Sequence, residues 1–268
     1  MPSVGRLRFL EALPAPETKH RKRGALVLLH AFPLSGRMWE AQLALAAHGW
    51  HVIAPNVRGV DGQDGDPPAN TIDDYAADII DLLDGLHVEE AVVGGLSMGG
   101  YIVFALLRHA PSYVRALILA DTRSQADTPE GLEGRKKLLA VVNSQGADAV
   151  ADQMIPKLLG ETTRATKPEI AEHVRGLIRS NSSEAIAGGI RALMSRPDST
   201  PQLAAIHVPT LVVVGEEDVI TPQSAAEELH SRIAGSELVC IPAAGHLSNL
   251  EQPAAFNSAL ARFLEHRV

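Results

Sequence analysis

The chain has 268 residues, of which 46% are hydrophobic and 21% are charged, and its formal net charge is −8 at pH 7. This length is sufficient for one large α/β domain with a complete core, without any need for disulfides. The acidic balance argues against a nucleic-acid partner, because phosphates attract a basic surface.

The N-terminal residues have no basic segment followed by an apolar stretch. Nor does any segment approach the roughly 18 uninterrupted apolar residues of a membrane span. We therefore expect a cytoplasmic protein that does not bind membranes.

Two local features have ordinary structural explanations. The single cysteine, Cys240, lies in the apolar run 238–241, which favours a small buried side chain over a reactive thiol. The one densely basic stretch, residues 20–23, fits a solvated loop better than a binding patch.

Six short apolar runs are expected to form the strands of a parallel sheet. The first, at 25–30, is bounded by Gly24 and Pro33 and is too short for a helix, which predicts a strand buried on both faces. The other five runs are at 51–55, 91–94, 115–120, 210–214 and 237–241.

Helical patterns separate these runs. They are expected at 38–47, from Thr71 onward, at 100–110, at 222–234 and at 253–266. Thr71 and Asp74 form a plausible helix cap with an acidic first turn. Alternating strands and helices predict a parallel sheet covered on both faces, with its active site beyond the carboxyl ends of the strands.

Residues 123–201 interrupt this alternation, because they contain helical patterns and no strand-like run. The patterns are at 131–142, 147–159, 167–180 and 183–195. We expect a helical cap at 123–201, inserted between the two parts of an α/β core at 1–122 and 202–268.

The sequence Gly95-Leu96-Ser97-Met98-Gly99 lies between a predicted strand and a predicted helix. Alone, it is explained equally well by a helix-capping serine and by a nucleophile. An acid, Asp218, and a histidine, His246, follow later strands in the chain order Ser, Asp, His that is typical of hydrolases of this architecture. A serine nucleophile needs such a base, and the base needs an acid to orient it.

The sequence resembles the α/β-hydrolase superfamily over nearly its whole length. The matching segments are Gly95 to Gly100, the His30-Ala31-Phe32-Pro33 turn, 215–218 followed by Pro222, and 244–246 followed by 251–253. The resemblance implies the α/β-hydrolase fold, a mostly parallel sheet with helices on both faces and a small helical cap. It also implies Ser97 as the nucleophile, His246 as the base and Asp218 as its orienting acid.

By the same resemblance, the backbone N–H groups of Met98 and Phe32 form the oxyanion hole. Each such donor contributes about 3 to 4 kcal/mol to stabilisation of the transition state. Many relatives have glycine where this chain has Ala31, which adds a methyl group but removes no amide. His30 is expected to brace this turn rather than act as a base, and Asp121, which also follows a strand, is the alternative acid.

The expected reaction is hydrolysis of small to medium carboxylic esters or lactones through an acyl-enzyme on Ser97. The turn at 29–33 and the segment 120–123 resemble those of small bacterial carboxylesterases and 3-oxoadipate enol-lactonases. The side chains expected to line the substrate site are Phe32, Met98, Arg123, Met154, Leu158 and Met194. Arg123 either faces a substrate carboxylate or anchors a helix, and the sequence gives more weight to the second role.

Other outcomes stay open at this point. A cofactor-free haloperoxidase or perhydrolase uses the same three residues with peroxide in place of water, and a receptor-type relative binds a ligand almost without turnover. No metal or nucleotide cofactor is expected, because the chain has no matching motif. The expected partner is a small-molecule ester or lactone, and a homo-oligomer is compatible with the sequence.

Overall fold

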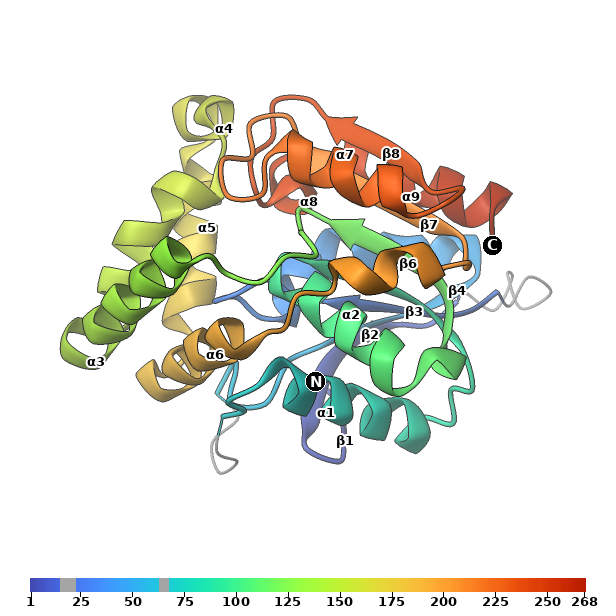
Figure 1. Ribbon diagram of the computed structural model, residues 1–268, viewed down its shortest axis with the longest axis horizontal. Coiled ribbons are helices and arrows are strands. Elements are labelled where there is room, and N and C mark those ends of the chain that lie inside the picture. Colours follow the sequence, from blue (N-terminus) through green and yellow to red (C-terminus); the bar gives the residue numbers. More distant parts are fainter. Residues whose placement is uncertain (15–22, 63–67) are drawn as a thin grey trace.

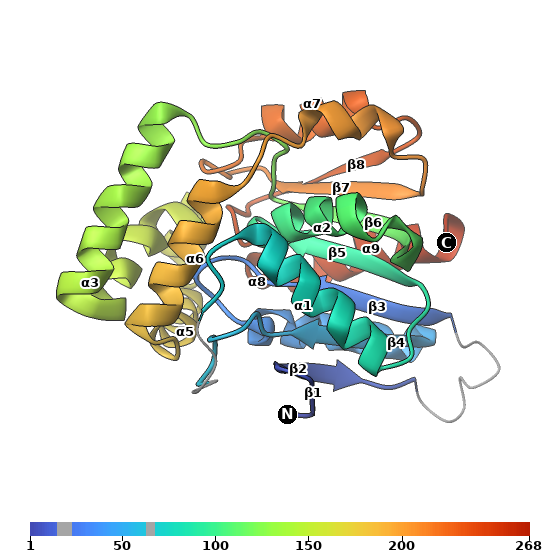
Figure 2. The same cartoon turned by 60° about the horizontal axis from the view of Figure 1, so that its bottom comes forward.

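The computed structural model describes residues 1–14, 23–62 and 68–268, and these residues form a mostly parallel eight-stranded sheet between two layers of helices (Figures 1 and 2). The strand order is β1-β2-β4-β3-β5-β6-β7-β8, parallel from β4 to β8 and antiparallel at β1 and β2. The strands are β1 (Ser3–Val4), β2 (Leu7–Ala12), β3 (Gly24–Leu29), β4 (Trp50–Pro55), β5 (Ala91–Leu96), β6 (Val114–Ala120), β7 (Thr210–Gly215) and β8 (Glu237–Ile241). The predicted α/β class is therefore confirmed.

All six predicted strands are present, whereas β1 and β2 were not predicted. Every residue of β5 and β7 is buried, as continuous apolar runs require between two helical layers. In β2, by contrast, Leu7 and Phe9 are buried while Arg8 is exposed. Its short alternation of apolar and polar residues is a weaker signal than an unbroken apolar run.

The helices of the core lie on both faces of the sheet. They are η2 (Gly36–His48, a 3-10 helix), α1 (Ile72–Gly85), α2 (Met98–His109), η3 (Pro111–Tyr113), η4 (Thr200–Ala205), α7 (Gln223–Arg232), α8 (Ser248–Glu251) and α9 (Pro253–His266). Helices α1 and α2 pack together on one face, and η2 contacts α9 on the other (Figure 2). The predicted cap of α1 is confirmed: Asp74 N donates to Thr71 Oγ1 (3.0 Å) and Thr71 N donates to Asp74 Oδ2 (3.1 Å).

Four helices, α3 (Pro129–Leu158), α4 (Glu161–Thr166), α5 (Pro168–Arg179) and α6 (Ser183–Ser195), are inserted between β6 and β7 and project to one side of the core (Figure 1). We call residues 123–201 the cap segment. Gly146 interrupts α3 with a left-handed backbone (φ 79°), so two helical stretches meet there, as the sequence predicted. The short helix α4 was not predicted.

The two ends of the cap segment meet at the edge of the core. Ser199 N donates to Ser124 O at 2.8 Å. Nearby, the Asp127 carboxylate binds Arg196 at 2.7 Å and Arg135 at 3.2 Å. The Arg196 guanidinium also stacks over the ring of Tyr101 in α2, 4.3 Å from its centroid. Both connections to the cap are thus fixed to each other and to the core.

The expectation for Cys240 was wrong, because this side chain is exposed. Among the described strands, β8 is at the edge of the sheet and pairs only with β7, so its apolar run is not enclosed as the runs of central strands are. Partial desolvation of the sulfur, followed by the charges of Glu216 and Asp121, raises the pKa of the thiol, which favours its neutral form. Residues 20–22 of the basic stretch lie outside the described residues.

Candidate active site

Ser97 occupies the sharp turn between β5 and α2, at the carboxyl end of the sheet. Its backbone has a positive φ (φ 55°, ψ −112°), a strained conformation for a residue with a side chain, which points to a functional requirement. Ser97 N donates to Ala120 O, the last residue of β6, at 3.0 Å, and Thr122 Oγ1 donates to Ser97 O at 2.9 Å. The end of β6 and the residues after it therefore bind both the N–H and the carbonyl of Ser97.

Glycines on either side of Ser97 make this turn sterically feasible. A Cβ atom on Gly95 would collide with the backbone of Gly99, and one on Gly99 would collide with the carbonyl of Leu29 in β3. These backbones approach more closely than any side chain permits. The G-x-S-x-G spacing thus reflects packing against β3 as well as the turn itself.

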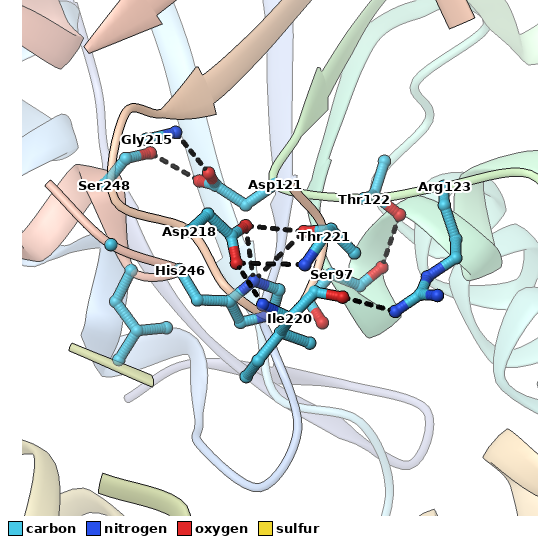
Figure 3. Close-up of polar contacts among 12 residues, drawn as sticks. Ser97, Asp121, Thr122, Arg123, Gly215, Asp218, Ile220, Thr221, His246 and Ser248 are labelled. Carbon is cyan, nitrogen blue, oxygen red and sulfur yellow. Dashed lines mark hydrogen bonds and ion pairs between the residues drawn. The ribbon is translucent and has the colours of Figure 1, made fainter. Parts of the chain in front are cut away.

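His246 follows β8 and is hydrogen-bonded to Asp218, which follows β7 (Figure 3). The His246 Nδ1 atom lies 2.8 Å from Asp218 Oδ2, and both side chains are almost completely buried. Thr221 donates its hydroxyl to Asp218 Oδ2 at 2.6 Å, and the backbone N–H groups of Ile220 and Thr221 donate to Oδ1 at 2.8 and 2.9 Å. Each oxygen atom of the Asp218 carboxylate therefore has two hydrogen-bond partners.

The charge of Asp218 is retained despite burial. Burial alone would raise the pKa of Asp218, but the electrostatic interaction with His246 and the hydrogen bonds from His246 and Thr221 hold it below its usual value. An ionised Asp218 is the form that accepts the Nδ1 proton of His246 and leaves Nε2 free to act as a base.

Asp121, the alternative acid, is also buried but has different partners. Its Oδ1 accepts from Gly215 N at 2.8 Å and its Oδ2 accepts from Ser248 Oγ at 2.5 Å. Burial first, and the charge of Asp218 second, raise the pKa of Asp121 well above its usual value. His246 is therefore hydrogen-bonded to Asp218, whereas Asp121 is hydrogen-bonded to Gly215 at the end of β7 and to Ser248 at the start of α8.

Contacts between the loops bring Ser97 and the acid–base pair to one place. Thr122 binds the carbonyl of Ser97, and the next residue, Arg123, donates to the carbonyl of Ile220 at 2.5 Å (Figure 3). Ile220 in turn donates its N–H to Asp218. A continuous series of contacts thus runs from the turn of Ser97 to residues 216–222, the loop between β7 and α7 that carries Asp218, which we call the acid loop.

The turn after β3 contains the second expected oxyanion donor, Phe32. Its conformation is closed by a hydrogen bond from Leu34 N to Ala31 O (2.9 Å), with a cis peptide bond between Phe32 and Pro33. The first residue of α2 is Met98, whose N–H lacks an acceptor within the helix. The ring of Phe32 packs so closely against α6 that Gly189 has no room for a Cβ atom.

His30 braces this turn, as expected. Its Nδ1 lies 2.9 Å from Ala31 O and its Nε2 accepts from Val57 N at 3.1 Å. Complete burial lowers the pKa of His30 to about 4, against partial opposition from the Ala31 carbonyl and Asp61. The imidazole is therefore neutral at pH 7, with both nitrogen atoms occupied.

The expected substrate-lining residues fall into separate places. Phe32 and Met98 line a small apolar cavity beside α6. Arg123 and Met154 line a larger cleft of about 560 Å³ between α3 and the acid loop. Leu158 is buried in the packing of α3, whereas Met194 is partly buried and packs against the core. The six side chains therefore do not form one continuous lining.

The sequence profile of the alpha/beta hydrolase fold matches residues 24–253 of the chain. The chain belongs to the alpha/beta hydrolase family. The family resemblance drawn from the motifs is thus confirmed, and the fold of this alpha/beta hydrolase is the one that the family implies.

Several relatives are similar over almost their whole length. The chain is 30% identical over 238 residues to 3-oxoadipate enol-lactonase 2 of Acinetobacter baylyi. The aligned region covers 89% of this chain and 87% of that protein. A thermophilic esterase from Thermogutta terrifontis, solved with malate bound, is 36% identical with a TM-score of 0.89, covering 97% of this chain and 93% of the esterase. The enol-lactonase of Burkholderia xenovorans is 26% identical with a TM-score of 0.86, covering 97% and 96%.

Sequence reasoning missed several residues of this alpha/beta hydrolase that contact the site. Thr221 binds both members of the acid–base pair, with its Oγ1 atom 3.1 Å from His246 Nδ1. Its position three residues after Asp218, where hydroxyl side chains often close turns, was an available signal. Glu217, which directly precedes Asp218, binds Thr162 in the cap segment, and no sequence motif indicated this contact.

Among the residues that the structure describes, no group of three or more His, Cys, Asp or Glu side chains is placed to hold a metal ion. Within the same part of the chain, no helix has the length and apolar character needed to cross a membrane.

Proposed function

We propose that this alpha/beta hydrolase cleaves carboxylic esters or lactones of small to medium size, as a carboxylesterase or enol-lactonase. The observation that carries the proposal is the buried hydrogen bond between His246 and Asp218, at the carboxyl ends of the strands, where Ser97 also lies. This arrangement supplies a base with a fixed tautomer near the strand-to-helix turn, in which Ser97 is half-buried between buried neighbours. The enol-lactonase and esterase relatives support the same reaction class.

In the proposed first step, Ser97 Oγ attacks the carbonyl carbon of the ester or lactone while His246 Nε2 takes the hydroxyl proton. The N–H groups of Met98 and Phe32 stabilise the negative oxygen of the tetrahedral intermediate. His246 then donates its proton to the leaving alkoxide, and the acyl group stays on Ser97.

In the second step, a water molecule attacks the acyl-enzyme and His246 accepts its proton. The second tetrahedral intermediate collapses, the bond between Ser97 and the acyl carbon breaks, and the proton returns to Ser97 Oγ. Throughout, Asp218 stabilises the imidazolium form of His246. No step requires a metal or a cofactor.

Substrate selection is assigned to the cap segment and the rim of the site. We propose that residues 123–201 act as a cap domain over the core at 1–122 and 202–268. In this proposal, Phe32 and Met98 contact the part of the substrate next to the reacting carbonyl, and Arg123 and Met154 contact a more distant part. A cleft of about 560 Å³ suits a ligand of small to medium size.

Hydrolysis of p-nitrophenyl butyrate by wild type and by Ser97→Ala tests the proposal. We expect wild-type turnover and a loss to below about one per cent in the variant, because no other nucleophile replaces the serine. Ser258→Ala, which alters an exposed serine on α9, is the matched control and should keep full activity. An active Ser97→Ala protein would refute the assignment.

A further inference from the structure

Glu251 is a fully buried carboxylate with no assigned role, and both of its oxygen atoms are hydrogen-bonded. Its Oε1 atom accepts from Gly245 N at 2.9 Å and from Leu247 N at 3.2 Å, the residues immediately before and after His246. Its Oε2 atom accepts from Gly160 N, at the start of α4, at 2.8 Å. One side chain thus holds the backbone on both sides of the proposed base and links it to the cap segment.

A second carboxylate, Glu217, makes the corresponding contact from the acid loop. It directly precedes Asp218 and accepts from Thr162 N at 2.9 Å, and it also accepts a hydrogen bond from the Thr162 hydroxyl. The first turn of α4 therefore receives two carboxylates. Glu217 comes from the loop that carries Asp218, and Glu251 comes from α8, which directly follows the loop that carries His246.

The backbone at the start of α4 lies directly against the His246 loop, residues 242–247 between β8 and α8. A Cβ atom on Gly160 would collide with Glu217 Oε2 and Gly245 N, and one on Gly245 would collide with the backbone of Gly160. At the other end of α4, Lys167 Nζ donates to the Glu251 carbonyl at 2.8 Å. Helix α4 is thus bound at its start to the Glu251 side chain and at its end to the Glu251 carbonyl, both in α8 directly after the His246 loop.

We infer that Glu251 is a positioning residue for His246, and that Glu217 supports Asp218 by binding the loop of Asp218 to α4. The inference rests on the proposed function. A buried carboxylate is unfavourable unless it is fully hydrogen-bonded. Glu251 accepts from the backbone N–H groups of Gly245 and Leu247, and these contacts fix the position of the His246 imidazole between them. Helix α4 is in consequence a structural part of the catalytic site, besides being part of the cap segment.

Replacing Glu251 with glutamine separates the two contacts. The amide oxygen of Glu251→Gln still accepts from the His246 loop, but its NH₂ group then faces the N–H of Gly160, so two donors oppose each other. Glu251→Ala removes both contacts. Thr162→Val removes only the hydroxyl bond to Glu217, at a half-buried position. Glu265→Gln, an exposed carboxylate on α9, is the matched control.

The measured quantities are kcat per active site, titrated with a p-nitrophenyl phosphonate, and KM for p-nitrophenyl butyrate. We expect kcat to fall about tenfold in Glu251→Gln and about a hundredfold in Glu251→Ala, with KM changed less than about threefold, because small misplacement of a reacting group slows chemistry more than binding. Thr162→Val should lower kcat by about two- to fivefold. The Glu265→Gln control should match wild type.

The His246 ring signals in the NMR spectrum of histidine-labelled protein give a second readout that needs no substrate. We expect them to shift and broaden in Glu251→Gln and to stay unchanged in Glu265→Gln. Unchanged kcat per titrated site in both Glu251→Gln and Thr162→Val, with unchanged ring signals, would overturn the inference. If wild type hydrolyses no ester, the proposed function fails by itself, and the ring signals still report whether Glu251 holds His246.

Discussion

Asp121 and Asp218 follow the neighbouring strands β6 and β7, yet only Asp218 contacts His246. Both side chains are buried, and the charge of Asp218 contributes to the raised pKa of Asp121. Two buried carboxyl groups in one site therefore have opposite environments. Asp218 is surrounded by donors that favour its ionised form, whereas burial favours the neutral form of Asp121.

Asparagine substitutions distinguish the two acids. We expect Asp218→Asn to lower kcat by about 10³- to 10⁴-fold, because the amide no longer favours the tautomer and charge that His246 needs. In Asp121→Asn, the amide oxygen accepts from Gly215 and the NH₂ group donates to Ser248, so kcat should fall by less than about tenfold. Steady-state kinetics check this, and equal losses in the two variants would contradict it.

Arg123 is expected to select substrates that carry a carboxylate. Its Nε atom is buried without a partner, and its Nη2 atom is oriented by the Ile220 carbonyl. For Arg123→Met, we expect kcat/KM for a p-nitrophenyl hemisuccinate to fall about 10- to 100-fold, the equivalent of one charge-assisted contact.

The neutral butyrate ester serves as the comparison for Arg123, because it has no carboxylate to lose. Its kcat/KM should fall by less than about threefold in Arg123→Met, and Arg123→Lys should retain part of the preference since the charge remains. Equal losses for the two esters would mean that Arg123 only anchors the acid loop.

His30 makes stability depend on pH in the mildly acidic range. Its pKa is about 4 in the folded protein and 6.5 without burial, so the unfolded chain binds a proton that the folded one does not. The contribution is complete above pH 6.5 and is lost as the pH falls toward 4, to a limit of about 3 kcal/mol. Urea unfolding at a series of pH values measures it.

His30→Gln keeps one donor and one acceptor but does not titrate. The variant should therefore show a flatter dependence of the free energy of unfolding on pH between 6.5 and 4. His48→Gln, at an exposed position, is the control and should keep the wild-type slope. The same slope in all three proteins would argue against a neutral buried His30.

Gly99 is expected to tolerate no side chain. A Cβ atom there would collide with the carbonyl of Leu29, so Gly99→Ala should destabilise the protein by about 1 to 3 kcal/mol or more and displace Ser97. Gly176→Ala in α5, where a Cβ atom meets no neighbour within 4 Å, should instead stabilise it by about 0.5 to 1 kcal/mol. Thermal melts of the two variants provide the comparison.

The sequence predicted those parts of the fold that local patterns determine. Continuous apolar runs located β3 through β8, but a run does not reveal which strand lies at the edge, and for this reason Cys240 was misjudged. The motifs placed Ser97, Asp218 and His246 after strand ends, and their catalytic roles stay predictions. The bond between Glu251 and Gly160 joins residues 91 positions apart, and it depends on how the cap folds back, which no local pattern encodes.

The meeting of Ser124 and Ser199 has a consequence for how such enzymes diversify. Strands β6 and β7 pair directly, so the chain leaves the sheet and re-enters it at a single seam. A segment inserted between Ser124 and Ser199 leaves the register of β6 and β7 unaltered, because these two residues are already in contact. A different helical segment could therefore replace residues 123–201 without moving the sheet, provided that it restores contacts with the core such as those of Glu217, Glu251 and Tyr101.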